Sequence, residues 1–202
     1  MTATRMESNP NEGPATSGPT PTFESCYAEV APALYAWAEL RIRPQLRARL
    51  DPQDLVQEVW LRGIKNYARF DARETSFRAW IFKIGKNVML EALRALRTEN
   101  AAQPGWSPTT KMMALDGVPQ SVTSFTQRLA REDSVREFLT QAGELEEQDR
   151  MILIHCGLED ETCAEVGTKL GLTEDATIKR WQRLRGKLRE RPWANSLLAD
   201  RG

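Results

Sequence analysis

Residues 76–97 combine aromatic, basic and amide side chains that could hold a nucleic acid. Wound at about 100° per residue, this segment places its cations and an amide on one arc, formed by Lys83, Lys86, Asn87, Arg94 and Arg97. The other side carries an apolar stripe, formed by Phe77, Ile81, Ile84, Val88 and Ala92. The stripe predicts a core contact. The arc alone is compatible with a phosphate-facing surface and with a solvated face, although solvated faces usually mix signs.

A second basic helix is predicted after Thr173, which is suited to cap it. Its spacing gives one buried stripe, made of Thr177, Trp181, Leu184 and Leu188. The outward residues are Ile178, Lys179, Gln182, Arg183 and Lys187, and the flanking cations are Arg180, Arg185 and Arg189. Together with the helix predicted before Gly171, this is the pattern of a helix-turn-helix, whose second helix reads base edges while flanking cations contact phosphates. An exposed basic helix without a ligand is the alternative.

The stretch "DPQDLVQEVW" (residues 51–60) predicts an amphipathic helix with Asp51 as its N-cap and Pro52 in its first turn. Leu55 and Val59 are expected to pack inward. The side chains on another face offer carboxylates, an amide and an apolar group to a partner: Asp54, Gln57, Glu58 and Leu61. We expect Asp54 and Glu58 to be exposed. An ordinary solvated face fits the same pattern.

Catalysis and metal binding are not predicted. His155 is the single histidine, and a zinc site needs about four ligands, so it is expected to be a packed core residue within "MILIHCGL". The three cysteines are too few and scattered for a disulfide framework. The chain carries no nucleophile–base pair or glycine-rich phosphate loop. We therefore expect neither an enzyme nor a cofactor.

These segments are expected to belong to an all-α protein with two small helical domains on a flexible linker. Residues 1–22 are predicted to be a disordered tail, and residues 192–202 a C-terminal tail. The two domains are predicted over residues 23–97 and 131–191. Residues 98–130 between them are predicted to be a linker with short helical fragments. The net charge of the chain is zero. Residues 131–160 nevertheless carry three cations against nine acids, and residues 179–191 carry seven against one. This asymmetry indicates a local contact with a polyanion. No signal peptide or membrane span is recognisable, so a soluble cytoplasmic protein is expected.

The stretch "LGLTEDATIKRWQRLRGKLR" (residues 170–189) resembles region 4 of the extracytoplasmic-function sigma factors, small bacterial promoter-specificity subunits of the sigma-70 family. The resemblance implies that this helix-turn-helix contacts the minus-thirty-five element. The residues that it implies are Thr173, Ile178, Lys179, Arg180, Gln182, Arg183, Arg185 and Lys187. Ile178 stands where the family usually has a basic residue, which implies an apolar contact with a base.

Residues 51–94 resemble region 2 of the same family. The resemblance implies that a face containing Asp51, Asp54, Gln57, Glu58 and Leu61 docks on the β′ clamp helices of core RNA polymerase. It also implies that Phe70 and the loop "DARETS" capture a flipped base of the minus-ten element, while the following helix holds the separated strand. The implied minus-ten residues are Phe70, Thr75, Ser76, Lys83, Lys86, Asn87 and Arg94. Trp80 and Phe82 are assigned mainly to the core.

The resemblance implies a non-catalytic sigma factor that binds promoter DNA and core polymerase, including the β flap of the polymerase. It also implies control by an anti-sigma factor or by another regulator such as a kinase. A helix-turn-helix regulator with a helical dimerisation or sensing domain is the first alternative. A protein-interaction module whose basic helix meets an acidic partner is the second. The "DLVQE" helix followed by an aromatic loop and a basic helix favours the sigma factor, since a dimerisation domain does not need that loop.

Overall fold

The structure is a computed structural model that describes residues 21–47, 49–102, 120–129, 131–191 and 193–199. Within these ranges it is entirely helical, so the all-α prediction is confirmed. Its helices are α1 (Phe23–Arg41), η1 (Pro44–Leu46), α2 (Pro52–Asn66), η2 (Tyr67–Arg69), α3 (Phe77–Ala102), α5 (Gln120–Leu129), α6 (Asp133–Glu144), α7 (Glu147–Ile152), η3 (Leu153–Leu158), α8 (Cys163–Leu170), α9 (Glu174–Leu188) and α10 (Ala194–Leu197). Residues 1–20 of the tail predicted over residues 1–22 lie outside the described residues, as does most of the predicted linker.

Local signals account for where several helices begin and end. Asp51 caps α2, with its Oδ1 accepting from the Gln53 N–H at 2.7 Å, and Thr173 caps α9 through the Ala176 N–H at 3.2 Å. Thr162 begins α8 in a reciprocal capping box with Glu165. Gly171 ends α8 in the left-handed conformation (φ 68°), which favours glycine. The caps predicted at Asp51, Thr173 and Gly171 are confirmed.

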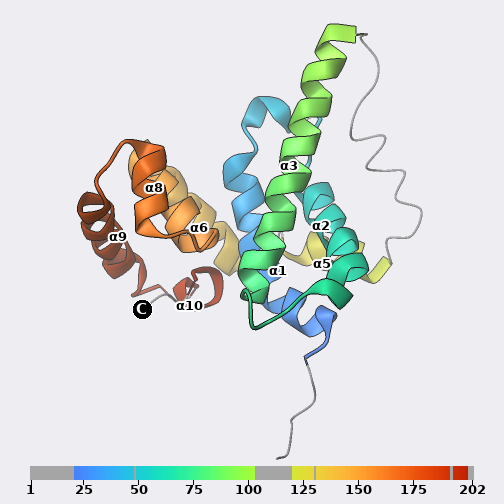
Figure 1. Cartoon of the computed structure of the whole chain (residues 1–202), viewed down its shortest axis with the longest axis horizontal. Helices are drawn as coiled ribbons and strands as arrows, with labels where there is room; N and C mark the ends of the chain where they lie inside the picture. Colours follow the sequence, from blue (N-terminus) through green and yellow to red (C-terminus); the bar gives the residue numbers. More distant parts are fainter. Residues whose placement is uncertain (1–20, 48, 103–119, 130, 192, 200–202) are drawn as a thin grey trace, which may run out of the picture.

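Helices α1, α2, α3 and α5 form a group that we call the N-terminal unit (Figure 1). Leu55 and Val59 of α2 are fully buried, as predicted, and Val56 is fully buried as well. The three longer helices approach closely at Gly63. A Cβ atom there would lie 2.8 Å from Phe23 Cζ and 2.9 Å from Ile81 Cδ1, so this crossing leaves no room for a side chain.

Helices α6 to α10, with η3, form the C-terminal unit, in which the consecutive helices α8 and α9 pack against each other (Figure 1). The α9 residues predicted to form a buried stripe are all buried. Gly167 allows the turn to fold back on α8, since a Cβ atom would lie 2.9 Å from the Leu172 carbonyl oxygen. Trp193 packs edge-on against Phe138, with ring centroids 5.1 Å apart.

The two units share one continuous hydrophobic core, in contrast to the predicted tethered domains. Helix α1 joins them, because it packs on α2, α3 and α5 on one side and on α6, η3 and α10 on the other. Two predicted boundaries also differ from the structure. Helix α5 lies within the predicted linker yet packs on α2, and the predicted C-terminal tail contains α10 with Trp193 and Leu197 buried. Both segments carry apolar side chains that the core covers.

Replacing Gly63 by Ala should destabilise the chain, because the added methyl group meets the buried Phe23 ring. Overpacking of this kind costs about 1–3 kcal/mol. Gly186→Ala is the matched control, since α9 leaves open space around that position and alanine favours a helix by about 1 kcal/mol. Chemical denaturation should therefore show a lower unfolding free energy for Gly63→Ala and an unchanged or higher one for Gly186→Ala. Equal stability of the two variants would contradict the close crossing.

Candidate nucleic-acid and polymerase interface

Phe70 lies at the end of η2, in a cluster of aromatic side chains. Its ring stacks on Tyr67 with centroids 5.9 Å apart, meets Phe77 edge-on at 5.6 Å and lies 5.2 Å from Trp80. Phe70 and Trp80 are both half-buried, so one side of this cluster remains accessible. An aromatic surface fixed by neighbouring rings can receive an unstacked base. Trp80, which the sequence analysis assigned mainly to the core, therefore shares the accessible edge with Phe70.

The loop of residues 71–76 is short and locally ordered. Asp71 Oδ1 accepts from the Arg73 backbone N–H at 2.9 Å, and the Arg73 guanidinium pairs with the same carboxylate at 2.7 Å. These hydrogen bonds from Arg73 lower the pKa of the Asp71 carboxyl group. Ser76 Oγ accepts from the Ala79 N–H at 3.1 Å and so fixes the start of α3. Of the two hydroxyl residues predicted to face the strand, Ser76 is exposed and Thr75 half-buried.

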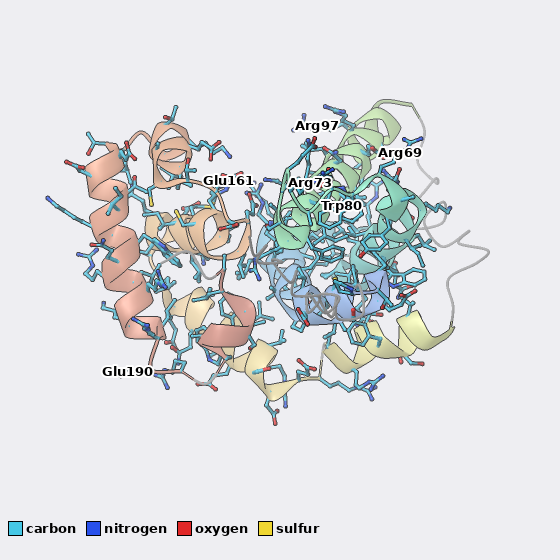
Figure 2. All side chains as sticks on the ribbon, turned by 60° about the horizontal axis from the view of Figure 1, so that its bottom comes forward. Arg69, Arg73, Trp80, Arg97, Glu161 and Glu190 are labelled. Atoms are coloured by element: carbon cyan, nitrogen blue, oxygen red, sulfur yellow. The ribbon has the colours of Figure 1, made fainter. Side chains whose placement is uncertain are left out.

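The residues of the predicted basic arc on α3 differ in their exposure to solvent. Lys83, Asn87, Arg94 and Arg97 are exposed. Lys86 is half-buried, because its Nζ pairs with two carboxylates of the C-terminal unit. It lies 3.0 Å from Glu161 and 3.5 Å from Glu159. On the opposite side, Ile81 and Val88 are buried as predicted. Figure 2 shows Arg69, Arg73, Trp80 and Arg97 within the N-terminal unit, with Glu161 at the boundary between the units.

The predicted polymerase face of α2 is less open than expected. Gln57 and Leu61 are buried, and Gln57 Nε2 donates to Thr126 Oγ1 of α5 at 3.2 Å. Asp54 and Glu58 are half-buried, so the expectation that both are exposed needs correction. Helix α5 covers part of this face, which the sequence could not indicate because the contact joins residues 69 apart. Burial and the nearby Asp51 raise the pKa of the Asp54 carboxyl group.

Glu58 belongs to an ion-pair network on the same side. Arg62 Nε lies 2.6 Å from Glu58, and its Nη1 lies 2.7 Å from Glu91 of α3. One guanidinium therefore holds the carboxylates of two helices. The hydrogen bonds and charges of both acids raise the pKa of Arg62 against the opposing effect of burial.

The predicted recognition helix α9 presents Lys179, Gln182, Arg183 and Lys187 to solvent. Ile178 and Arg185 are half-buried and line a cavity of about 300 Å³ with Cys156, Cys163 and Gln182. Arg180 differs from the expectation of a phosphate-facing cation. It hydrogen-bonds to Gln148 and lies 3.5 Å from Asp149 of α7, because α7 packs directly against α9.

Sequence reasoning missed a polar cluster at the boundary between the units. The Glu159 carboxylate is buried and accepts from Trp37 Nε1 at 2.6 Å, and it lies 3.1 Å from His155 Nδ1 and 3.6 Å from Arg41 Nε. His155 is buried, as predicted, but it packs as a member of this cluster. The available signals were an acid at the end of an apolar run and a buried tryptophan whose N–H needs an acceptor.

Comparison with known families finds a match within the N-terminal unit. Residues 26–99 match the family model of sigma-70 region 2. The matched segment contains most of α1, all of α2 and most of α3. No curated protein and no solved structure matches the chain. Among the described residues, no helix has the length and apolar character needed to cross a membrane.

The pH dependence of stability should reveal the Glu159 cluster. Burial alone would raise the pKa of Glu159, but the hydrogen bonds from His155 and Trp37 and the charge of Arg41 lower it to about 2 from its ordinary value of 4.5. A lowered folded-state pKa stabilises the fold above the unfolded value, and this contribution is lost as the pH falls from about 4.5 toward 2. The difference in unfolding free energy between the wild type and Glu159→Gln should therefore shrink over this range. Urea denaturation at stepped pH measures it, and a constant difference would contradict the charged cluster.

Proposed function

We propose that this protein is a sigma factor of the extracytoplasmic-function type, which directs core RNA polymerase to promoters and performs no catalysis itself. The region 2 match over residues 26–99 is the observation that carries the proposal, and it supports a role in transcription initiation. A helix-turn-helix protein with a dimerisation or sensing domain does not require such a region. The protein would act in the bacterial cytoplasm, under an anti-sigma factor or another regulator.

The contact with polymerase is proposed for the acidic side of α2. Asp51, Asp54 and Glu58 supply carboxylates there, while Gln57 and Leu61 would join the contact after α5 moves away from this face. The β′ clamp helices are the proposed partner, and the β flap is proposed to contact the C-terminal unit. Carboxylates at the edge of an apolar contact favour a basic partner surface.

Recognition of the minus-ten element is proposed for the aromatic cluster and the arc on α3. Phe70 and Trp80 offer accessible ring surface for an extruded base, beside Thr75 and Ser76. Lys83, Asn87 and Arg94 continue along the exposed side of α3. Stacking on aromatic rings and cations along the backbone together favour a single strand over a closed duplex.

Recognition of the minus-thirty-five element is proposed for α9. Thr173 begins the helix, and Lys179, Gln182, Arg183 and Lys187 form an exposed polar side that fits the major groove. Arg185 would contact phosphate and Ile178 a base. Arg180 would have to leave its contacts with Gln148 and Asp149 to reach DNA, so its proposed role is the smallest of this set.

Core binding tests the proposal directly. Asp54→Arg should abolish capture by core RNA polymerase, because it places a cation where a basic partner surface is expected. Glu29→Arg, the same charge change at an exposed position of α1, is the control and should bind as the wild type does. Pull-down with purified core polymerase, followed by run-off transcription of genomic fragments, measures both. Wild-type protein that neither binds core polymerase nor starts transcription would refute the proposed function.

Promoter opening tests the aromatic cluster. Phe70→Ala with Asn87→Ala should leave closed-complex binding nearly intact but prevent opening, because the captured base loses stacking of about 1–3 kcal/mol. A template mismatched across the minus-ten element should restore much of the transcription, since its bases are already unpaired. Permanganate footprinting of unpaired thymines on both templates, with a melting curve for each protein, measures these effects. Normal opening of a fully paired promoter by the variant would exclude this role.

A further inference from the structure

We propose that Cys156 and Cys163 form a redox-active dithiol in the C-terminal unit, which hydrogen peroxide oxidises to an intramolecular disulfide. Both residues are free thiols in the structure. A reversible disulfide of this kind is a site of modification, in contrast to the structural framework that the cysteine count excludes. The oxidation can be tested without DNA, whereas its effect on promoter binding rests on the proposed function.

The packing of η3 against α8 brings the two cysteines to one cavity. Cys156 belongs to η3, and Cys163 is the first residue of α8. The chain folds back between them, and the Glu161 N–H donates to the His155 carbonyl oxygen at 3.0 Å. Both cysteines line the cavity of about 300 Å³. A cavity of this volume admits molecules the size of water or hydrogen peroxide. A single oxidant molecule can therefore reach both sulfur atoms.

The two thiols differ in their accessibility. Cys156 is buried and Cys163 is half-buried. The side chains are close enough to share a hydrogen bond. Burial, the neighbouring Cys163 and the charge of Glu161 raise the pKa of the Cys156 thiol to about 12, so this residue keeps its proton at neutral pH. Cys163 is therefore the thiol that a dissolved oxidant oxidises first, and Cys156 is the one that reacts with the product.

The reaction requires only hydrogen peroxide and the two thiols. The Cys163 sulfur attacks one peroxide oxygen, the O–O bond breaks, and a sulfenic acid and water form as the thiol proton passes to the departing hydroxide. The Cys156 sulfur then attacks the Cys163 sulfur and the S–O bond breaks. The Cys156 proton leaves with this hydroxide as a second water. The two thiols together lose two electrons, and these electrons reduce one peroxide molecule to two waters.

The surroundings of the pair favour a local reaction. Gln182 and Arg185 of α9 line the same cavity, and their N–H groups are donors that can hold the oxygen atoms of a peroxide. Cys26, the third cysteine of the chain, lies on α1 outside this cavity. It therefore provides an internal reference for thiol oxidation.

The disulfide would join η3 to the first turn of α8 and so affect the helix proposed to read DNA. Helix α8 leads into α9 through a tight turn, in which the Leu172 N–H donates to the Gly167 carbonyl oxygen at 2.8 Å. Ile178 and Gln182, both proposed for contact with the minus-thirty-five element, line the cavity that contains the two thiols. Drawing α8 toward η3 shifts this wall of the cavity. The oxidised chain should therefore bind duplex DNA more weakly than the reduced chain.

Peptide mass spectrometry tests the dithiol. The reduced full chain is treated with hydrogen peroxide in the presence of a metal chelator, and the remaining thiols are blocked with N-ethylmaleimide. Trypsin leaves both cysteines in one peptide, residues 151–169. In the wild type this peptide should carry no label and should weigh two hydrogen atoms less than the reduced peptide, while Cys26 remains labelled. Dithiothreitol should restore both labels. A peptide that still carries two labels, or a crosslink to Cys26, would overturn the proposal.

Single substitutions test the order of the two steps. Cys156→Ser should accumulate a sulfenic acid at Cys163 that dimedone traps, because the second thiol is missing. Cys163→Ser should leave Cys156 reduced at the same dose of peroxide. Cys26→Ser is the matched control and should form the disulfide as the wild type does. Circular dichroism verifies that each variant remains helical. Dimedone labelling of Cys156 in place of Cys163 would contradict the assigned order, and the wild-type peptide decides the proposal even where a variant does not fold.

The effect on DNA binding is measured separately by fluorescence anisotropy. The probe is a labelled duplex from a promoter that the run-off transcription identifies. Oxidised wild type should bind it about fivefold more weakly than reduced wild type, whereas peroxide should not change the affinity of Cys163→Ser. Equal affinity of the two wild-type forms would overturn the effect on α9. If the duplex binds neither form while the disulfide appears, the proposed minus-thirty-five function fails and the dithiol stands.

Discussion

Helix α1 is buried on nearly all sides in its second half, and an apolar segment of this kind is stable in water only when other elements cover it. Its buried side chains run from Phe23 to Ala38, and Trp37 is fully enclosed. The bundle of α2 and α3 covers one side only. Helices α6 and α10, with η3, cover the other, so the hydrophobic effect by itself requires the two units to meet along α1.

Enclosing α1 creates a second requirement, which polar groups meet. The indole N–H of Trp37 becomes buried and needs an acceptor, which Glu159 supplies from the other unit. Glu159 in turn needs positive or donor groups, and His155, Arg41 and Lys86 surround it. The apolar contact therefore decides that the units meet, and the polar cluster decides how they are aligned.

Helix α3 has a packed side and an exposed side. Its apolar stripe is constrained by packing, while the exposed arc is open to a ligand. Two residues of α3 do not fit this division. Lys86 lies on the arc but is held by acids of the C-terminal unit, and Trp80 belongs to the aromatic cluster but keeps an accessible edge. Residues 77–99 of this helix lie within the match to the family model of sigma-70 region 2.

The sequence by itself determined the features that depend on neighbours within one or two helical turns. These include the helical class, the caps at Asp51, Thr173 and Gly171, and the division of α9 between Trp181 on its buried side and Lys179 on its exposed side. Such features follow from periodicity and from short-range hydrogen bonds.

Only the tertiary structure decided which polar residues remain available to a ligand. Gln57 is buried by a helix 69 residues away, Lys86 is paired with an acid 75 residues away, and Trp37 meets its acceptor over 122 residues. Arg180, which its helix alone would leave facing outward, is held by α7. Burial of a polar side chain depends on which distant element covers it and whether that element offers a partner. The local pattern of residues indicates neither of these two conditions.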